Sequence, residues 1–89
     1  MTARQYALEF APKAIRSLGK LDRSVAKRIR AAAEALCDDP RPTGARMLTG
    51  MHGVWRIRVA KDYRIVYTLD DDRLVILVLD AGHRREIYR

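Results

Sequence analysis

The chain has 89 residues, of which 48% are hydrophobic and 33% are charged. This balance excludes an intrinsically disordered chain and fits a single small globular domain spanning residues 1–89. Eighteen Lys and Arg residues outnumber eleven Asp and Glu residues, which gives a net charge of +7 at pH 7. Such an excess in a small domain indicates a nucleic acid or an acidic protein as the partner.

The sequence shows no sign of export, of a membrane span or of a disulfide. Its N-terminal residues lack the apolar run of a signal peptide, and the longest apolar run, residues 74–79, is far too short to span a bilayer. Cys37 is the single cysteine, and its place near the end of a predicted helix suits a small packed thiol. We therefore expect a cytoplasmic protein without disulfide, metal or other cofactor.

The first third of the chain predicts a strand and two helices. Residues 6–10 alternate as a strand does, and Pro12 then suits the first turn of a helix that ends at Gly19. Asp22 or Ser24 caps a longer second helix. The expected buried stripes are Ala11, Ala14, Ile15 and Leu18 in the first helix and Val25, Ile29, Ala32, Ala33 and Leu36 in the second.

The outer side of the second helix is basic, because Lys27, Arg28 and Arg30 lie largely off its apolar stripe. We expect a solvated surface, or a contact for ribosomal RNA if the partner is the ribosome.

The rest of the chain predicts strands joined by short connections. Residues 39–44 form a loop, residues 47–48 begin a short strand, and residues 70–72 form a turn. The apolar run of residues 74–79 predicts a strand that is buried on both faces and therefore central. We expect an α+β domain in which an N-terminal strand and a two-helix hairpin precede a three- to four-stranded antiparallel sheet, with the helix pair covering one face.

Two strands of the predicted sheet carry arginines at alternate positions. Residues 55–59 and 63–67 are separated by a three-residue loop, and in both segments one parity is apolar. A hairpin that keeps the apolar residues together sets Arg58 opposite Arg64, with Arg56 on the same face. Like charges directly opposite one another destabilise a sheet, so this hairpin is expected to hold a polyanion. Trp55 shares parity with Ile57 and is expected to anchor the core rather than to stack on a base.

These residues suit phosphate chemistry that needs no metal. Arginines fixed around a phosphate stabilise the charge that develops when a ribose 2′-hydroxyl attacks it. His83 is a candidate catalytic group or an ordinary surface histidine, and Tyr88 either stacks on a base or packs back onto the sheet. The arginines themselves have an alternative role as a solvated sheet face.

Three segments, residues 55–59, 62–67 and 82–88, resemble the RelE/ParE superfamily of bacterial type II toxins. The strand–helix–helix–sheet order and the loop at residues 39–42 agree, so the resemblance covers nearly the whole chain. RelE-like members cut mRNA in the ribosomal A site, whereas ParE-like members poison DNA gyrase on a similar fold. The resemblance implies the RelE-like activity here, with a ParE-like gyrase inhibitor and a catalytically weak module that binds its antitoxin as alternatives.

The resemblance also assigns roles to residues. It matches Arg56 and Arg58 to a pair of basic residues and Arg64 to the phosphate-binding arginine. It matches Arg84 to the arginine assigned to leaving-group stabilisation or acid catalysis, and Tyr88 to the base-stacking tyrosine. Arg85 joins the expected phosphate-binding set. The well-studied RelE pattern has lysines at the paired positions, one of them the proposed general base, whereas arginine is effectively never deprotonated. Proton removal is then left to water, to His83 or to a group of the ribosomal RNA.

The partners implied by the resemblance are an antitoxin protein, the ribosome and mRNA. The antitoxin would mask the basic face in a toxin–antitoxin hetero-oligomer, and the +7 charge is consistent with an acidic masking segment.

Overall fold

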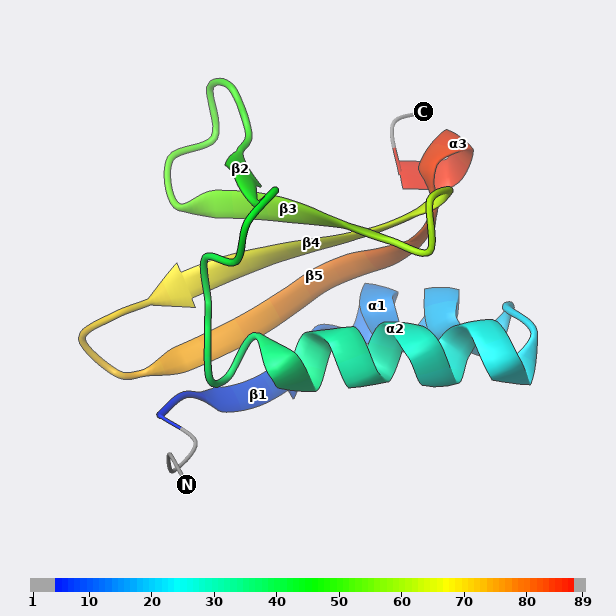
Figure 1. Ribbon diagram of the computed structural model, residues 1–89, viewed down its shortest axis with the longest axis horizontal. Helices are drawn as coiled ribbons and strands as arrows, with labels where there is room; N and C mark the ends of the chain where they lie inside the picture. Colours follow the sequence, from blue (N-terminus) through cyan, green and yellow to red (C-terminus); the bar gives the residue numbers. More distant parts are fainter. Residues whose placement is uncertain (1–4, 88–89) are drawn as a thin grey trace.

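The computed structural model describes residues 5–87, which form an α+β domain with one mixed sheet (Figure 1). The strands are β1 (Ala7–Phe10), β2 (Arg46–Met47), β3 (Val54–Val59), β4 (Tyr63–Asp70) and β5 (Val75–His83). The helices are α1 (Pro12–Gly19), α2 (Arg23–Ala35) and α3 (Arg84–Ile87).

The strands lie in the order β1-β5-β4-β3-β2. Strands β2 to β5 pair antiparallel, as expected for a chain with short connections. The first strand joins the same sheet parallel to β5. The two helices after β1 carry the chain to the opposite edge, where β2 begins, and the antiparallel strands then lead back until β5 lies beside β1. The prediction that the apolar run is the central strand was wrong: β4 is central, and β5 lies between β4 and β1.

The β3–β4 hairpin has the register that its alternation predicts. Arg58 pairs with Arg64, Ile57 with Ile65, and Val59 with Tyr63. The three-residue loop closes through Ala60 and Lys61, whose φ angles of 48° and 70° are left-handed and uncommon for residues other than glycine. Loop length and side-chain parity together therefore fix which residues share each face.

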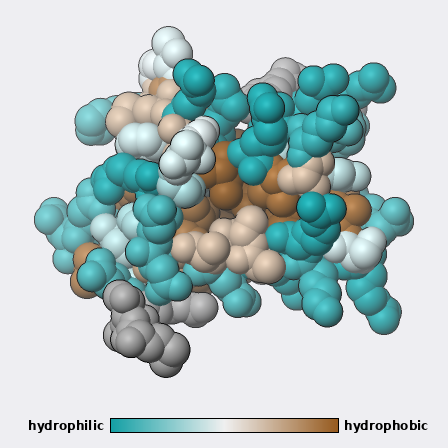
Figure 2. Space-filling view, viewed as in Figure 1, coloured by the Kyte–Doolittle hydropathy of each residue, from teal (hydrophilic) through white to brown (hydrophobic). Residues whose placement is uncertain are grey.

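One face of the sheet packs against α1 and α2. Pro12 stands in the first turn of α1, and Ala14 and Leu18 from α1 join Ile29 and Ala33 from α2 in the core. Their partners in the sheet include Ile57, Ile65, Tyr67, Ile76, Val78 and Ala81. Figure 2 shows apolar residues as a strip between α2 and the sheet, with hydrophilic residues on both sides of it.

Two details of the predicted helices changed. Ile15 was expected in the buried stripe of α1 but is 58% exposed. The buried stripe of this short helix is narrow, and Ile15 lies beside it against a shallow cavity that Phe10 and Arg30 also line. Asp22 is the N-cap residue of α2, although its side chain makes no capping hydrogen bond. Cys37 is fully buried, as expected for a small packed thiol.

The loop after α2 is tied to the turn between β4 and β5. Asp71 in that turn accepts hydrogen bonds from the Tyr6 hydroxyl (2.6 Å) and from Arg41 Nη2 (2.7 Å). These bonds hold the pKa of Asp71 below its usual value and raise the pKa of Tyr6. The Arg41 guanidinium also lies 5.4 Å from the centre of the Trp55 ring, which is half-buried against the core.

A second contact fixes the same loop from inside the core. The hydroxyl of Tyr67 is buried and donates a 2.8 Å hydrogen bond to the carbonyl of Pro40. Burial raises the pKa of this hydroxyl to about 12. The loop therefore leads into β2 at a defined place, one residue earlier than the sequence predicts, and β2 pairs with the edge of β3.

Candidate nucleic-acid interface

The face of the sheet opposite the helices carries two cross-strand rows of residues. In the first row Arg58 pairs with Arg64, which pairs with Gly82. In the second row Arg46 pairs with Arg56, then Val66, then Asp80. Directly paired residues point to the same side of an antiparallel sheet. We call the surface formed by Arg46, Arg56, Arg58 and Arg64 the arginine face.

The arginine face is not uniformly exposed, which corrects the expectation of a simple guanidinium surface. Arg58 is exposed and Arg56 half-buried, but Arg64 is only 6% exposed. Arg64 Nη1 donates hydrogen bonds to the carbonyls of Lys61 (3.1 Å) and Tyr63 (3.0 Å). The hairpin loop therefore holds the guanidinium in one position.

The fixed guanidinium of Arg64 retains an unused donor. Its Nε is buried and has no hydrogen-bond partner among residues 5–87. Leaving a buried donor on a charged group unpaired costs about 1–3 kcal/mol or more. Gly82, the cross-strand neighbour of Arg64, leaves the space beside it open. An oxyanion placed between Arg64 and Arg58 would offset the repulsion between these two like charges.

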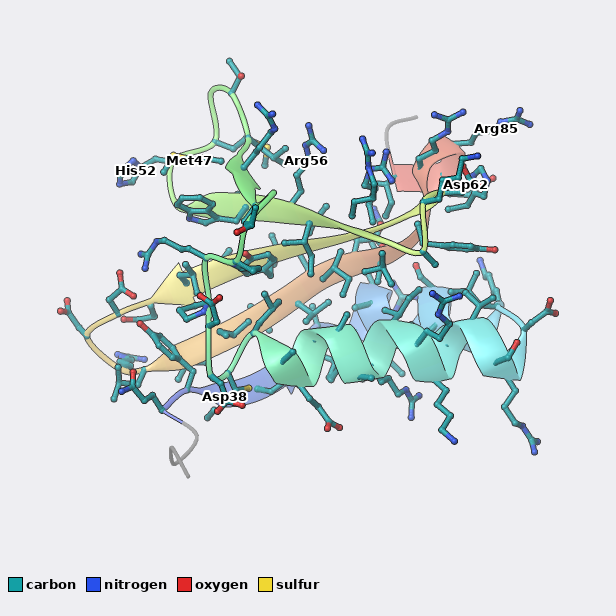
Figure 3. The ribbon with its side chains drawn as sticks, in the orientation of Figure 1. Asp38, Met47, His52, Arg56, Asp62 and Arg85 are labelled. Carbon is teal, nitrogen blue, oxygen red and sulfur yellow. The ribbon has the colours of Figure 1, made fainter. Side chains whose placement is uncertain are left out.

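Helix α3 starts at the same end of the sheet as the hairpin loop. The Arg84 backbone N–H donates a 2.8 Å hydrogen bond to the carbonyl of Asp62. Arg84 and Arg85 are both exposed, and Figure 3 shows Arg85 in α3 and Asp62 in the hairpin loop at the same end of the sheet. The structure thus brings Arg84 to the loop that anchors Arg64, as expected from the sequence.

His83 lies on the other side of the sheet from Arg64. It pairs with Tyr63, and the two rings meet edge to face with their centres 5.5 Å apart. Its Nδ1 accepts a 3.2 Å hydrogen bond from the backbone N–H of Arg85. With Nδ1 occupied as an acceptor, the neutral ring carries its proton on Nε2. The histidine therefore orients the start of α3 and does not face the phosphate site. Tyr88 lies outside the described residues.

Sequence reasoning did not include Arg46 in the site. This exposed residue of β2 stands opposite Arg56, so it extends the arginine face by one strand. It could have been predicted by pairing the expected short strand with β3, because the residues that share a face with Arg56 would then include Arg46.

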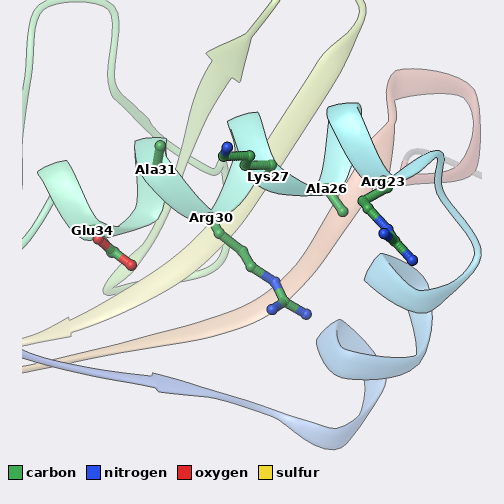
Figure 4. A pocket seen from close by; sticks show the side chains of 6 residues that line it. All are labelled: Arg23, Ala26, Lys27, Arg30, Ala31 and Glu34. Carbon is green, nitrogen blue, oxygen red and sulfur yellow. The ribbon is translucent and has the colours of Figure 1, made fainter.

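A second basic surface lies along the outer side of α2. A cavity of about 610 Å³ is lined by Arg23, Ala26, Lys27, Arg30, Ala31 and Glu34 (Figure 4). Lys27, Arg28 and Arg30 are exposed, as the sequence predicts. Figure 1 shows α2 on the opposite side of the sheet from α3 and the β2–β3 loop, so this surface is separate from the arginine face.

Residues 5–87 contain no group of three or more His, Cys, Asp and Glu side chains arranged to hold a metal ion. No helix in this part of the chain is long and apolar enough to cross a membrane.

Comparison with known proteins gives the family. The model of the ParE toxin of type II toxin–antitoxin systems matches residues 8–88. The chain belongs to this toxin family. It is 31% identical to the toxin RelG of Mycobacterium tuberculosis, over 94% of this chain and 97% of that protein. It is 29% identical to the mRNA interferase toxin RelE of Escherichia coli, over 93% of this chain and 90% of that protein.

Solved structures agree with this placement. The toxin–antitoxin complex RelBE2 of M. tuberculosis contains a chain that superimposes with a TM-score of 0.79 at 26% identity, covering 90% of this chain and 99% of that one. The isolated E. coli RelE toxin superimposes with a TM-score of 0.75 at 28% identity, covering 93% and 90%. The protein is therefore a RelE-like member of the RelE/ParE superfamily, and the resemblance noted from the sequence is confirmed.

Proposed function

We propose that this toxin is a ribosome-dependent endonuclease that cuts mRNA in the A site and so inhibits translation in the cytoplasm. The observation that carries the proposal is the buried guanidinium of Arg64, held opposite Arg58 with one buried donor unpaired among residues 5–87. Two relatives in E. coli and Shigella flexneri are named mRNA interferases, which supports the same activity.

The proposed reaction is a transfer within the RNA. A ribose 2′-hydroxyl loses its proton and its oxygen attacks the neighbouring phosphorus, while the bond to the 5′-oxygen of the next nucleotide breaks. The products are a 2′,3′-cyclic phosphate and a 5′-hydroxyl, and the leaving oxygen takes up a proton. DNA cannot react in this way because it lacks the 2′-hydroxyl.

The described residues suit separate parts of this reaction. Arg64 and Arg58 hold the phosphate and stabilise the charge that develops on its oxygens. Arg84, beside the hairpin loop, stabilises the leaving oxygen. Arg56 and Arg85 hold the neighbouring backbone. In this proposal Tyr88 stacks on a base, a contact that contributes about 1–3 kcal/mol where it has been measured by alanine substitution.

The proposed partners are the ribosome with its mRNA, and an antitoxin that forms a hetero-oligomer with the toxin. Toxin–antitoxin complexes of related chains have been solved, including the RelBE2 complex of M. tuberculosis. The net charge of +7 favours an acidic antitoxin segment over the arginine face.

The test combines purified toxin, ribosomes and an mRNA with a defined A-site codon. We expect a new 3′ end within that codon for the parent protein and for Arg16→Ala, and its loss in Arg58→Ala. Arg16 is an exposed arginine of α1 and provides the matched control. Intact cleavage by Arg58→Ala would show that the site is misplaced. Trapped gyrase–DNA complexes would favour a gyrase inhibitor. If the protein shows neither activity, the antitoxin-binding module is the alternative that is left.

A further inference from the structure

A small cavity of about 270 Å³ adjoins the arginine face. Val66 and Leu79 in the sheet line it, together with Met51 from the β2–β3 loop and Ile87 from α3. Val66 is the direct cross-strand neighbour of Arg56, so the cavity begins one strand away from a proposed phosphate-binding residue. An apolar cavity beside a phosphate contact has the arrangement that a nucleotide requires, with its base and its phosphate in adjacent places.

The polar edge of this cavity is formed by Asp80 and Lys13. Asp80 Oδ1 accepts hydrogen bonds from the Ser17 hydroxyl (2.8 Å) and from the Ala81 N–H (2.9 Å). Its Oδ2 lies 3.4 Å from Lys13 Nζ, and the Asp80 side chain is only 16% exposed. A carboxylate offers about four acceptor positions, so Oδ2 can accept one more donor. The cavity thus presents a fixed acceptor next to a donor.

We propose that this cavity holds one nucleobase of the bound RNA and that Asp80 and Lys13 determine which base is preferred. The proposal rests on the proposed function, because it places the base on the same RNA whose phosphate lies on the arginine face. A base that enters the cavity must offer an N–H to Asp80 Oδ2 and an acceptor to Lys13. Because the Asp80 side chain is only 16% exposed, a base that offers it no N–H binds less tightly, and Lys13 at the outer edge favours a base with an acceptor beside that N–H.

The substitution Asp80→Asn replaces the free acceptor at the polar edge of the cavity with a donor. The Ser17 hydroxyl and the Ala81 N–H both need an acceptor, so the amide oxygen of Asn takes the place of Oδ1. Its amino group then stands where Oδ2 stood and donates instead of accepting. Lys13→Met removes the neighbouring donor, and because the Lys13 side chain is 69% exposed, its loss affects folding little.

The experiment measures cleavage of ribosome-bound mRNA for every A-site codon. We expect Asp80→Asn and Lys13→Met to change the base preference at the same single codon position, by about fivefold or more, with normal thermal unfolding. Asp72→Asn, which removes an exposed carboxylate from the β4–β5 turn, is the matched control and keeps the parent preference. Unchanged preferences, or changes at two different positions, would overturn the proposal.

A second measurement separates this proposal from the proposed function. Anisotropy with labelled short oligoribonucleotides of each single base reports base preference without cleavage. If the parent protein does not cleave mRNA but Asp80→Asn alters this base preference, the base site is supported and the nuclease function is contradicted. If both variants change only the affinity for the antitoxin, the cavity is part of the antitoxin-binding surface and the proposal of a base site is wrong.

Discussion

The pairing of Arg58 with Arg64 predicts that one substitution raises stability and abolishes activity. Like charges directly opposite in an antiparallel pair have Cβ atoms about 4.5–5.5 Å apart and destabilise the sheet by about 0.2–1 kcal/mol. Arg58 is exposed, whereas Arg64 is held by the loop carbonyls and cannot move away. Arg58→Gln removes the repulsion while keeping a long polar side chain. We expect a gain of about 0.5 kcal/mol, which raises the Tm of a domain of this size by about 2–4 °C.

The same variant is expected to lose cleavage by about 100-fold, because it removes one fixed donor from the developing charge on the phosphate. The stability assay is thermal or urea unfolding at two ionic strengths. Raising the salt from about 0.01 M to about 1 M shortens the screening length from about 30 Å to about 3 Å, so the gain in stability should shrink. Arg28→Gln in α2 makes the same change in net charge and serves as the control.

Two results would refute the reasoning. If Arg58→Gln unfolds at a lower temperature than the parent protein at low salt, the arginine pair stabilises the free sheet. If its Tm follows that of Arg28→Gln at both salt concentrations, the effect belongs to the overall net charge and not to the cross-strand pair. Either outcome would remove the physical argument that this hairpin is arranged for an anion.

Three further predictions test other parts of the structure. Tyr67→Phe should cost about 0.5–1.5 kcal/mol in urea unfolding. Folding raises the pKa of Tyr67 from 10.0 to about 12, so the hydroxyl contributes its full share to the free energy of unfolding below pH 10 and loses it as the pH rises towards 12. The stability of Tyr67→Phe should therefore fall less over this pH range than that of the parent protein. Arg46→Gln should weaken RNA binding and lower the salt slope of log K by about one, whereas Arg16→Gln in α1 should not. His83→Asn, which keeps an acceptor for the Arg85 N–H, should retain most cleavage; a loss of about 100-fold would return His83 to the catalytic set.

The sequence predicts the hairpin better than its surroundings. The register that pairs Arg58 with Arg64 follows from a three-residue loop and side-chain parity, both of which are local. The burial of Arg64 does not follow from local features, because it depends on where the loop carbonyls point and on the position of α3 beside the loop. The parallel pairing of β1 with β5 is equally non-local, since it joins the first strand of the chain to the last one.

The candidate site shows the same division. Arg84 could be placed near the hairpin because it directly follows a strand paired with it. Asp80 could not be assigned to a cavity, since its partners Ser17 and Lys13 are more than sixty residues away in the chain. In the sequence it is only one acidic residue after an apolar run. Its fixed carboxylate becomes apparent only when α1 packs beside β5.

Proton removal is the step for which the arginine face is least equipped. Arginine stays protonated, so Arg58 and Arg64 stabilise charge but cannot accept the proton of a 2′-hydroxyl. His83 faces Tyr63 on the other side of the sheet, with Nδ1 already bonded to a backbone N–H. In the proposed mechanism the base is therefore water or a group of the ribosomal RNA. A toxin built in this way binds and polarises a phosphate by itself but needs the ribosome to orient the attacking hydroxyl and take its proton. Ribosome dependence then follows from the chemistry of arginine, in addition to any affinity for the ribosome.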